Sequence, residues 1–253
     1  MPWYRSDTML YGETPGAPRY RQVADVLAAE IESGALQPGS RLPSERTIAQ
    51  RHGLSRMTAR QAVELLLRRG LVTRRPGSGT YVAPARVEHS LQRFAGFTEQ
   101  MRAQGIEPGG RVLTVRLLNG EGSEAERALG LINGDACWMV KRVRFGDREP
   151  LLVEESYVPA SVCPDLTRHN LATTSLYAVM SDEYGVAPVR ATETIEPTAC
   201  EPDAARHLGT RAGAPCILVT RLAYDADGRA VEYARDVYRG DRARFVVELS
   251  KQS

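Results

Sequence analysis

Signals that start and stop helices follow one another so closely in residues 20–82 that only short helices fit there. Apolar residues at helical spacing predict a first helix that ends at Gly34, and they are Tyr20, Val23, Ala24, Leu27 and Ile31. Ser44 and Ser55 are good N-caps for a second and a third helix, which the turn at Gly53 separates. Two short helices joined by a glycine-containing turn predict a helix-turn-helix.

A β-hairpin is predicted directly after the third helix. Residues 71–75 and 80–82 alternate as short strands, and Pro76-Gly77-Ser78-Gly79 supplies the turn between them. A helix-turn-helix followed by such a hairpin is a winged helix, whose third helix enters the major groove of DNA. The hairpin tip can approach the sugar-phosphate backbone closely, because Gly77 and Gly79 carry no Cβ.

Charge is divided unevenly along the chain. The net charge is +2, but residues 1–83 hold twelve Arg, no Lys and seven acidic residues, and residues 41–75 hold nine Arg against two acids. This asymmetry indicates that the first part contacts a polyanion, with an Arg-rich solvated surface as the alternative. The candidate base or phosphate contacts are Arg46, Arg56 and Arg60, and the candidate hydroxyl donors to phosphate are Ser44, Ser55 and Thr58.

The stretch from Tyr20 to Val82 resembles the DNA-binding domain of the GntR family of bacterial transcription regulators over essentially its whole length. The resemblance rests on the motifs P-S-E-R, S-R-M-T-A-R-Q-A and G-S-G-T-Y-V at fixed separations. In that family the Arg of the first motif, the first Arg of the second and the first Gly of the third contact the operator. The resemblance therefore implies operator contacts by Arg46, Arg56 and Gly77.

The rest of the chain alternates strand-like and helical segments after a boundary around Pro84. Hairpin turns at Asp147-Arg148 and Asp227-Gly228 favour an antiparallel sheet with helices beside it. With 253 residues, the chain has room for two modest domains. We expect a disordered extension at 1–19, a winged helix-turn-helix domain at 20–83, a linker at 84–92 and a second domain at 93–253, to which the family resemblance assigns effector binding and dimerisation.

The second domain contains an internal repeat. Cys137, Val140 and Arg142 recur 79 positions later as Cys216, Val219 and Arg221. The pair Val153-Glu154 recurs 78 positions later as Val231-Glu232. A helix–strand–hairpin–strand unit used twice predicts two halves of one sheet related by a pseudo-twofold axis. A cleft between these halves would place Glu154 and Glu232 in matching positions, and exposed strand carboxylates are the alternative.

The region from Leu91 to Val247 resembles the effector domain of the HutC subfamily of GntR regulators, called the UTRA domain, whose fold is similar to that of chorismate lyase. Segments FTEQMRAQGIEP, KRVRF, TSLY, ETIEP and VYRGDRARF carry the resemblance, in particular to the N-acetylglucosamine repressors. The implied fold class is α+β, an N-terminal winged helix-turn-helix plus a C-terminal antiparallel-sheet UTRA domain. The implied effector site consists of Thr98, Arg142, Arg144, Glu154, Ser175, Tyr177, Arg190, Glu232 and Tyr238.

The chemistry of these side chains agrees with an anionic ligand. A phosphate needs several donors, and Arg142 and Arg144 lie two positions apart on one face of a predicted strand. Glu154 and Glu232 suit sugar hydroxyls or a ligand amine. The expected effector is a sugar phosphate such as glucosamine-6-phosphate or N-acetylglucosamine-6-phosphate, although two Arg would equally serve a carboxylate such as urocanate or a fatty acid.

Two classes of function follow. A ligand-controlled regulator, such as a repressor of sugar or amino-sugar utilisation genes, would bind a palindromic double-stranded operator as a homodimer, because one winged helix reads only a few base pairs. A lyase-like enzyme is the remote alternative, but the chain has no nucleophile elbow, phosphate loop or metal-spaced His/Cys group. We expect no cofactor, no metal, reduced cysteines and, without a secretion signal or membrane-spanning run, a cytoplasmic protein away from the membrane.

Overall fold

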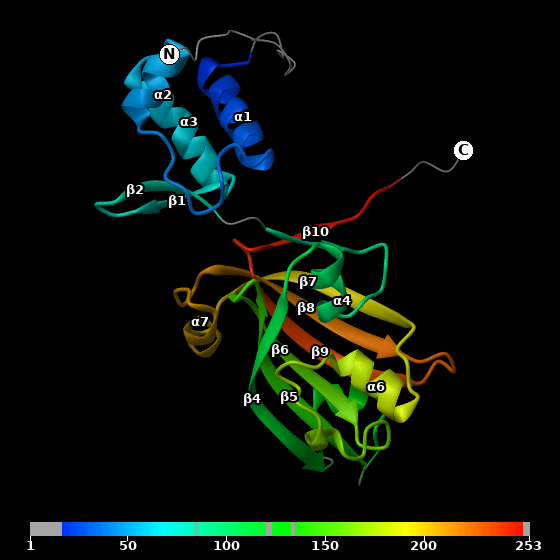
Figure 1. The fold of residues 1–253 in the computed structure, drawn as a ribbon. Helices are drawn as coiled ribbons and strands as arrows, with labels where there is room; N and C mark the ends of the chain where they lie inside the picture. Colours follow the sequence, from blue (N-terminus) through cyan, green and yellow to red (C-terminus); the bar gives the residue numbers. More distant parts are fainter. Residues whose placement is uncertain (1–16, 84–85, 120–122, 133–134, 250–253) are drawn as a thin grey trace. The chain divides into compact units, whose positions relative to one another are not determined.

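The protein is described here by a computed structural model, which covers residues 17–83, 86–119, 123–132 and 135–249 (Figure 1). It divides into two compact units, Met1–Ala85 and Arg86–Ser253. Most of the extension expected at 1–19 lies outside the described residues, and the first helix begins at Arg19. In the described part of the chain, no helix is long and apolar enough to cross a membrane.

The first unit is a winged helix, as its sequence predicts. Its elements are α1 (Arg19–Glu32), α2 (Glu45–His52), α3 (Arg56–Arg68) and the antiparallel hairpin β1 (Val72–Arg75) and β2 (Gly79–Val82). The three helices enclose a core of buried aliphatic side chains, among them Leu27, Ile48, Val63 and Leu66. Burial of this apolar surface holds the short helices in place, since none is long enough to be stable alone.

Serine caps fix where α2 and α3 begin. The hydroxyl of Ser44 accepts a hydrogen bond from the backbone N–H of Thr47, and that of Ser55 accepts one from Thr58, each at 3.1 Å. Gly53 ends α2 in the left-handed conformation, with φ of 61°. The predicted caps and the predicted turn are therefore confirmed, and together they set the angle at which α3 leaves the turn.

The second unit is built on a six-stranded antiparallel sheet with the strand order β4-β5-β6-β9-β8-β7 (Figure 1). Its strands are β4 (Pro108–Asn119), β5 (Ala136–Gly146), β6 (Glu149–Pro159), β7 (Arg190–Ala199), β8 (Pro215–Tyr224) and β9 (Ala230–Arg239). Its helices are α4 (Phe97–Ala103), α5 (Glu124–Ala128), α6 (Leu176–Tyr184) and α7 (Pro202–Leu208), with a short 3₁₀ turn at Leu166–Arg168. The predicted α+β fold is confirmed.

The predicted internal repeat appears in the topology of the sheet. The succession β4-α5-β5-β6 is followed by β7-α7-β8-β9, and β6 pairs with β9 at the centre of the sheet. Helix α6 packs with an apolar cluster that includes Val140 and Val158, whereas α7 packs with Val153 and Val237 of the opposite face (Figure 1). The two halves are thus related by a pseudo-twofold axis between β6 and β9.

The segment expected to link the two domains is not a plain linker. Residues Val87–Ser90, inside the expected linker 84–92, form strand β3, which pairs in parallel with β10 (Ala243–Val246) near the end of the chain. Parallel pairing between segments so far apart has no local turn to reveal it in the sequence. The part of the expected linker that stays outside a strand is therefore shorter than predicted.

Candidate DNA interface and effector site

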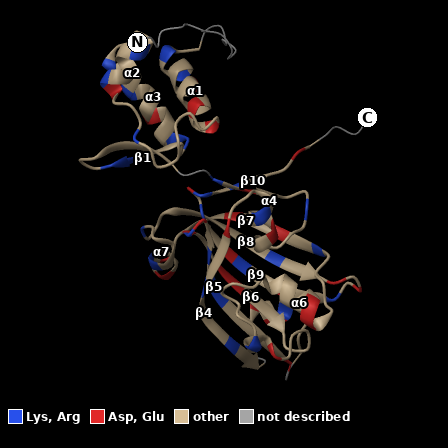
Figure 2. Cartoon of the chain, in the orientation of Figure 1, with Lys and Arg blue, Asp and Glu red and all other residues tan. Residues whose placement is uncertain are grey.

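The arginines predicted to contact DNA keep their guanidinium groups available on the winged helix. Arg46, Arg56 and Arg60 are exposed near the N-termini of α2 and α3, and they make no ion pair with any described residue. Other arginines of the same unit are used internally, because Arg51 pairs with Glu30, Arg69 with Asp25 and Arg74 with Glu64. Figure 2 shows basic positions on α2 and along β1.

The hydroxyl groups predicted to contact phosphate also make hydrogen bonds within the first unit. Ser44 contacts the hydroxyl of Thr47 at 2.8 Å, and Ser55 contacts the hydroxyl of Thr58 at 2.9 Å, in addition to capping the helices. These caps leave other backbone N–H groups of each first turn pointing outward, which suits a phosphate.

The tip of the wing is shaped by glycine. Gly77 has φ of 71°, a conformation that disfavours a side chain. At Gly79, a Cβ would lie 2.9 Å from the side chain of Arg41. Arg75 lies over the ring of Tyr81 at 4.4 Å, on the hairpin itself.

A hollow on one face of the sheet of the second unit brings together most of the side chains predicted to bind an effector. Helices α4 and α6 border it, and it lies over the central strands β5, β6, β8 and β9. Its lining includes Thr98, Arg142, Arg144, Glu154, Ser175, Tyr177 and Glu232. We call this hollow the effector pocket.

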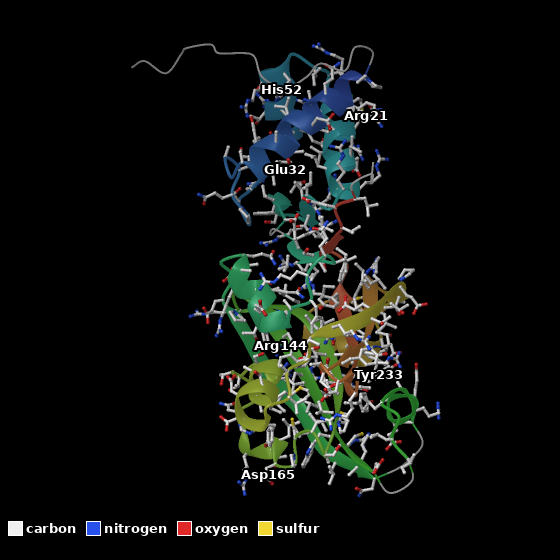
Figure 3. All side chains as sticks on the ribbon, turned by 90° about the vertical axis from the view of Figure 1, so that its right-hand side faces the viewer. Arg21, Glu32, His52, Arg144, Asp165 and Tyr233 are labelled. Carbon is white, nitrogen blue, oxygen red and sulfur yellow. The ribbon has the colours of Figure 1, made fainter. Side chains whose placement is uncertain are left out.

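Two arginines and one glutamate form the floor of the effector pocket. Arg142 lies opposite Glu154 in the β5–β6 register, and its Nη2 is 2.8 Å from a Glu154 oxygen, while Arg144 Nη1 is 3.5 Å from the same carboxylate. Arg144 also donates to the hydroxyl of Thr98 at 3.0 Å, and Arg142 donates to the Leu171 carbonyl at 2.9 Å. Both arginines are buried, and Figure 3 labels Arg144 within the second unit.

Arg142 and Arg144 each have a buried Nε–H group without a hydrogen-bond partner among the described residues. Burial lowers the pKa of Arg144, although the charge of Glu154 opposes this shift. Burial alone would raise the pKa of Glu154, but the charges of Arg142 and Arg144 hold it below the usual range. Two buried cations with unused N–H donors are suited to an anionic ligand.

A second network on the same face surrounds Glu232. Tyr177 donates to one oxygen of Glu232 at 2.6 Å, Ser156 donates to the other at 3.0 Å, and the Nε of Arg221 donates at 3.2 Å. Burial raises the pKa of Tyr177 well above its ordinary value, and the carboxylate of Glu232 acts in the same direction. The phenol is therefore a hydrogen-bond donor throughout the neutral range.

Helix α6 and the turn before α4 close the effector pocket. Ser175 is the N-cap of α6, and its hydroxyl accepts from the backbone N–H of Ala178 at 3.4 Å. Gly96 lies against Tyr177, because a Cβ at this position would come within 3.0 Å of the Tyr177 ring. A side chain at this position would press on the ring, so glycine suits the place where the chain crosses it.

Two of the predicted effector residues lie elsewhere. Tyr238 is buried in an adjoining hollow, where its ring meets His89 and Phe245 edge to face. Arg190 is exposed at the start of the edge strand β7, with its guanidinium 3.9 Å from the centre of the Tyr224 ring. The strand order separates Arg190 from the effector pocket, which lies over the central strands.

Two site residues were missed by sequence reasoning. Arg221 lines the effector pocket, and Asp236 pairs with it at 3.1 Å. The internal repeat matches Arg221 with Arg142, and this equivalence could have identified it. Asp236 had no such signal, because it faces Glu154 only through the long-range pairing of β6 with β9.

Comparisons with known proteins agree with this two-part structure. The model of bacterial regulatory proteins of the gntR family matches residues 19–82, and the UTRA domain model matches residues 103–244. The HTH-type transcriptional repressor NagR of Bacillus subtilis is 36% identical over 237 residues, which cover 93% of this chain and 96% of NagR. The mannosyl-D-glycerate transport/metabolism system repressor MngR of Escherichia coli is 29% identical, covering 93% of this chain and 98% of MngR.

Among solved structures, PhnF from Mycobacterium smegmatis is similar to this chain with a TM-score of 0.65 and 30% identity, covering 91% of this chain and all of the other. The related proteins NagR and MngR are transcriptional regulators, so the lyase-like alternative finds no support in them. The chain therefore belongs to the GntR family of bacterial transcription regulators, with a UTRA domain following its DNA-binding domain.

Proposed function

We propose that this protein is a repressor of sugar or amino-sugar utilisation genes, which binds a palindromic operator as a homodimer and is released by a small phosphorylated sugar. The observation that carries the proposal is the pair of buried arginines in the effector pocket. Their unused Nε donors offer hydrogen bonds that a phosphate can accept, and Thr98 and Ser175 add hydroxyls beside them. A phosphate is well matched by such dispersed, charged donors.

The winged helix supports operator binding. Exposed, unpaired Arg56 and Arg60 lie one turn apart on the same side of α3, where the family's third helix meets base edges. A single winged helix covers a short half-site. Two copies related by a twofold axis would cover a palindrome and combine their affinities.

The relatives support sugar chemistry. MngR is a repressor of a mannosyl-D-glycerate system, and the segments around the effector pocket resemble those of N-acetylglucosamine repressors. Residues of both kinds needed for a sugar phosphate meet in the effector pocket, since Arg142 and Arg144 suit the phosphate while Glu232 suits hydroxyl groups. A fatty acid would use the arginines but has no hydroxyl group to donate to Glu232.

The test measures release from DNA. A palindromic operator is selected from random duplexes with the full-length protein, and its affinity is followed by fluorescence anisotropy. Glucosamine-6-phosphate, N-acetylglucosamine-6-phosphate, inorganic phosphate and urocanate are then added in turn. We expect at least one sugar phosphate to weaken operator binding, whereas urocanate and inorganic phosphate leave it unchanged.

Two arginine variants serve as a matched pair. Arg144→Ala removes a guanidinium that lines the effector pocket, and Arg190→Ala removes one that the structure places outside it. We expect Arg144→Ala to bind the operator normally and to lose release by sugar phosphate, while Arg190→Ala keeps it. Release by urocanate alone would overturn the sugar-phosphate effector and leave the DNA-binding role standing.

A further inference from the structure

Met57 is the most exposed large apolar side chain of the first unit, among the residues that the structure describes. It is 64% exposed, whereas Val26 on α1, the other exposed side chain of this kind in the unit, is 37% exposed. Single apolar side chains are common on protein surfaces, so exposure alone assigns no role to Met57. Its position on α3 distinguishes it.

Met57 lies on the side of α3 that faces away from the core. The buried side chains of this helix are Ala59, Ala62, Val63 and Leu66. Because successive residues of an α-helix are about 100° apart around its axis, the second residue of α3 lies almost directly opposite these four. Met57 is therefore not part of the apolar core that the three helices enclose.

Polar and charged side chains surround Met57 on this outer side of α3. Arg56 precedes it, and the helical spacing places Met57 between Arg60 and Gln61, with which it lines a shallow hollow. Arg56 and Arg60 are exposed and make no ion pair with any described residue. When these two arginines contact DNA, the apolar side chain beside them is enclosed between the helix and the major groove.

The chemistry of methionine selects what Met57 can contact there. Its thioether has no hydrogen-bond donor, so it cannot bind a phosphate as an arginine does. In the major groove, thymine is the base that presents an apolar group, its C5-methyl, whereas arginine reads guanine. An unbranched, polarisable side chain adapts readily to a methyl group. Met57 thus supplies a kind of base readout that Arg56 and Arg60 cannot supply.

We infer that Met57 is a specificity residue of the DNA-binding unit, and that it contacts the methyl group of a thymine close to the base that Arg56 reads. The inference rests on the proposed operator binding and adds a base to those that α3 distinguishes. Neighbouring Cα atoms are about 3.8 Å apart and neighbouring bases of one strand about 3.4 Å apart along the DNA axis. The thymine therefore lies within about two base pairs of the position that depends on Arg56.

Replacement of thymine by deoxyuridine tests this contact, because it removes only the methyl group. The operator selected with the full-length protein is remade with one thymine replaced at a time, and binding is followed by fluorescence anisotropy. We expect one replacement in a half-site to weaken wild-type binding about fourfold, which is the effect of one buried methyl group. Met57→Ala should bind the thymine and deoxyuridine operators within about 1.5-fold of each other. Alanine favours the helix, so this variant keeps its fold.

Val26→Ala is the matched control, because it shortens an exposed apolar side chain on α1, and it should keep the fourfold ratio. If deoxyuridine weakened Met57→Ala as much as the wild type, the methyl group would act through DNA shape or another residue, and the role of Met57 would be wrong. A wild type that tolerates deoxyuridine at every thymine would also overturn that role, while the proposed operator binding would stand. Failure to select any operator would overturn both.

Discussion

Arg56 and Arg51 are both exposed on the helix-turn-helix, but only Arg51 has an internal partner, Glu30 at 2.7 Å. Arg56 stands at the first position of α3 with its charge unused. We expect Arg56→Ala to weaken operator binding by about 1–3 kcal/mol and to relax sequence preference at one position. Anisotropy measurements on the operator and on single-base variants of it check both effects.

Arg51→Ala is the matched control for Arg56→Ala. It removes the same side chain from the preceding helix and gives up a surface ion pair, which contributes about 0–1 kcal/mol to stability. We expect its operator affinity and sequence preference to stay close to wild type. If Arg51→Ala and Arg56→Ala lost the same affinity, the assignment of base contact to Arg56 would be wrong.

Asp236 also makes stability depend on pH. Burial raises its pKa to about 8; Arg221 opposes the shift, whereas Glu154, Glu232 and Glu193 favour it. Between about pH 4 and 8 the folded carboxyl holds a proton that the unfolded chain has released, so stability falls as pH rises through this range. Asp236→Asn cannot ionise, and it should lose less stability than wild type between pH 5.5 and pH 8.

Urea unfolding at the two pH values measures this difference. Buried His89, whose pKa burial lowers, lines the same hollow as Asp236 and contributes the opposite slope below its ordinary pKa. That contribution is common to wild type and Asp236→Asn, so it cancels when the two are compared. Identical pH slopes for both proteins would show that Asp236 is ionised in the folded state at pH 5.5.

The sequence predicts individual site residues where local spacing carries the chemistry. Arg142 and Arg144 are recognisable because alternate residues of a strand share a face, whereas Ser175 was implied only by the family resemblance. Asp236 and Arg221 needed the register of strands far apart in the chain. Arg190 was predicted to bind the effector because its motif matches the family, but a motif does not reveal that its strand lies at the edge of the sheet, away from the effector pocket.

At the scale of elements, the turn between β5 and β6 carries strain that can be relieved. Asp147 and Arg148 both have positive φ, 49° and 69°, as a type I′ hairpin requires. An L-residue such as Arg148 is disfavoured in this conformation. We expect Arg148→Gly to stabilise the protein by about 0.5–1 kcal/mol, measured as a higher urea midpoint.

Arg148→Ala separates relief of strain from loss of the charged side chain. Both substitutions remove the exposed guanidinium, but alanine keeps the Cβ that the left-handed conformation disfavours. The midpoint of Arg148→Ala should therefore stay near wild type. An equal gain in both variants would attribute the effect to charge and not to the backbone.

Helices and strands could be predicted where the residues that specify them lie close together in the sequence. The predicted serine caps and the turn at Gly53 place α2 and α3 correctly, and the same kind of signal occurs at α5, where Ser123 and Glu126 form the full capping box. Strand β3 was missed because its partner β10 lies more than 150 residues away in sequence. Its hydrogen bonds follow from chain topology, and no short pattern encodes them.

At the scale of the whole molecule, the predicted DNA contacts and the effector pocket lie in different units, and this limits how regulation can work. The predicted DNA contacts belong to the first unit, whereas the effector pocket belongs to the second. The two ligands therefore do not compete for the same atoms. Under the proposed function, the effector must bind more tightly to domain arrangements that bind the operator poorly.

Such coupling is reciprocal, and this gives the sharpest test of the whole protein. If the effector weakens operator binding by a given factor, the operator must weaken effector binding by the same factor, about 5–150-fold in typical systems. Calorimetry of the effector with free and operator-saturated protein gives one ratio, and anisotropy with and without effector gives the other. Equal ratios are expected in the wild type. Unequal ratios would mean that the effector also binds DNA or a site outside the coupled equilibrium, because a single shared equilibrium cannot produce them.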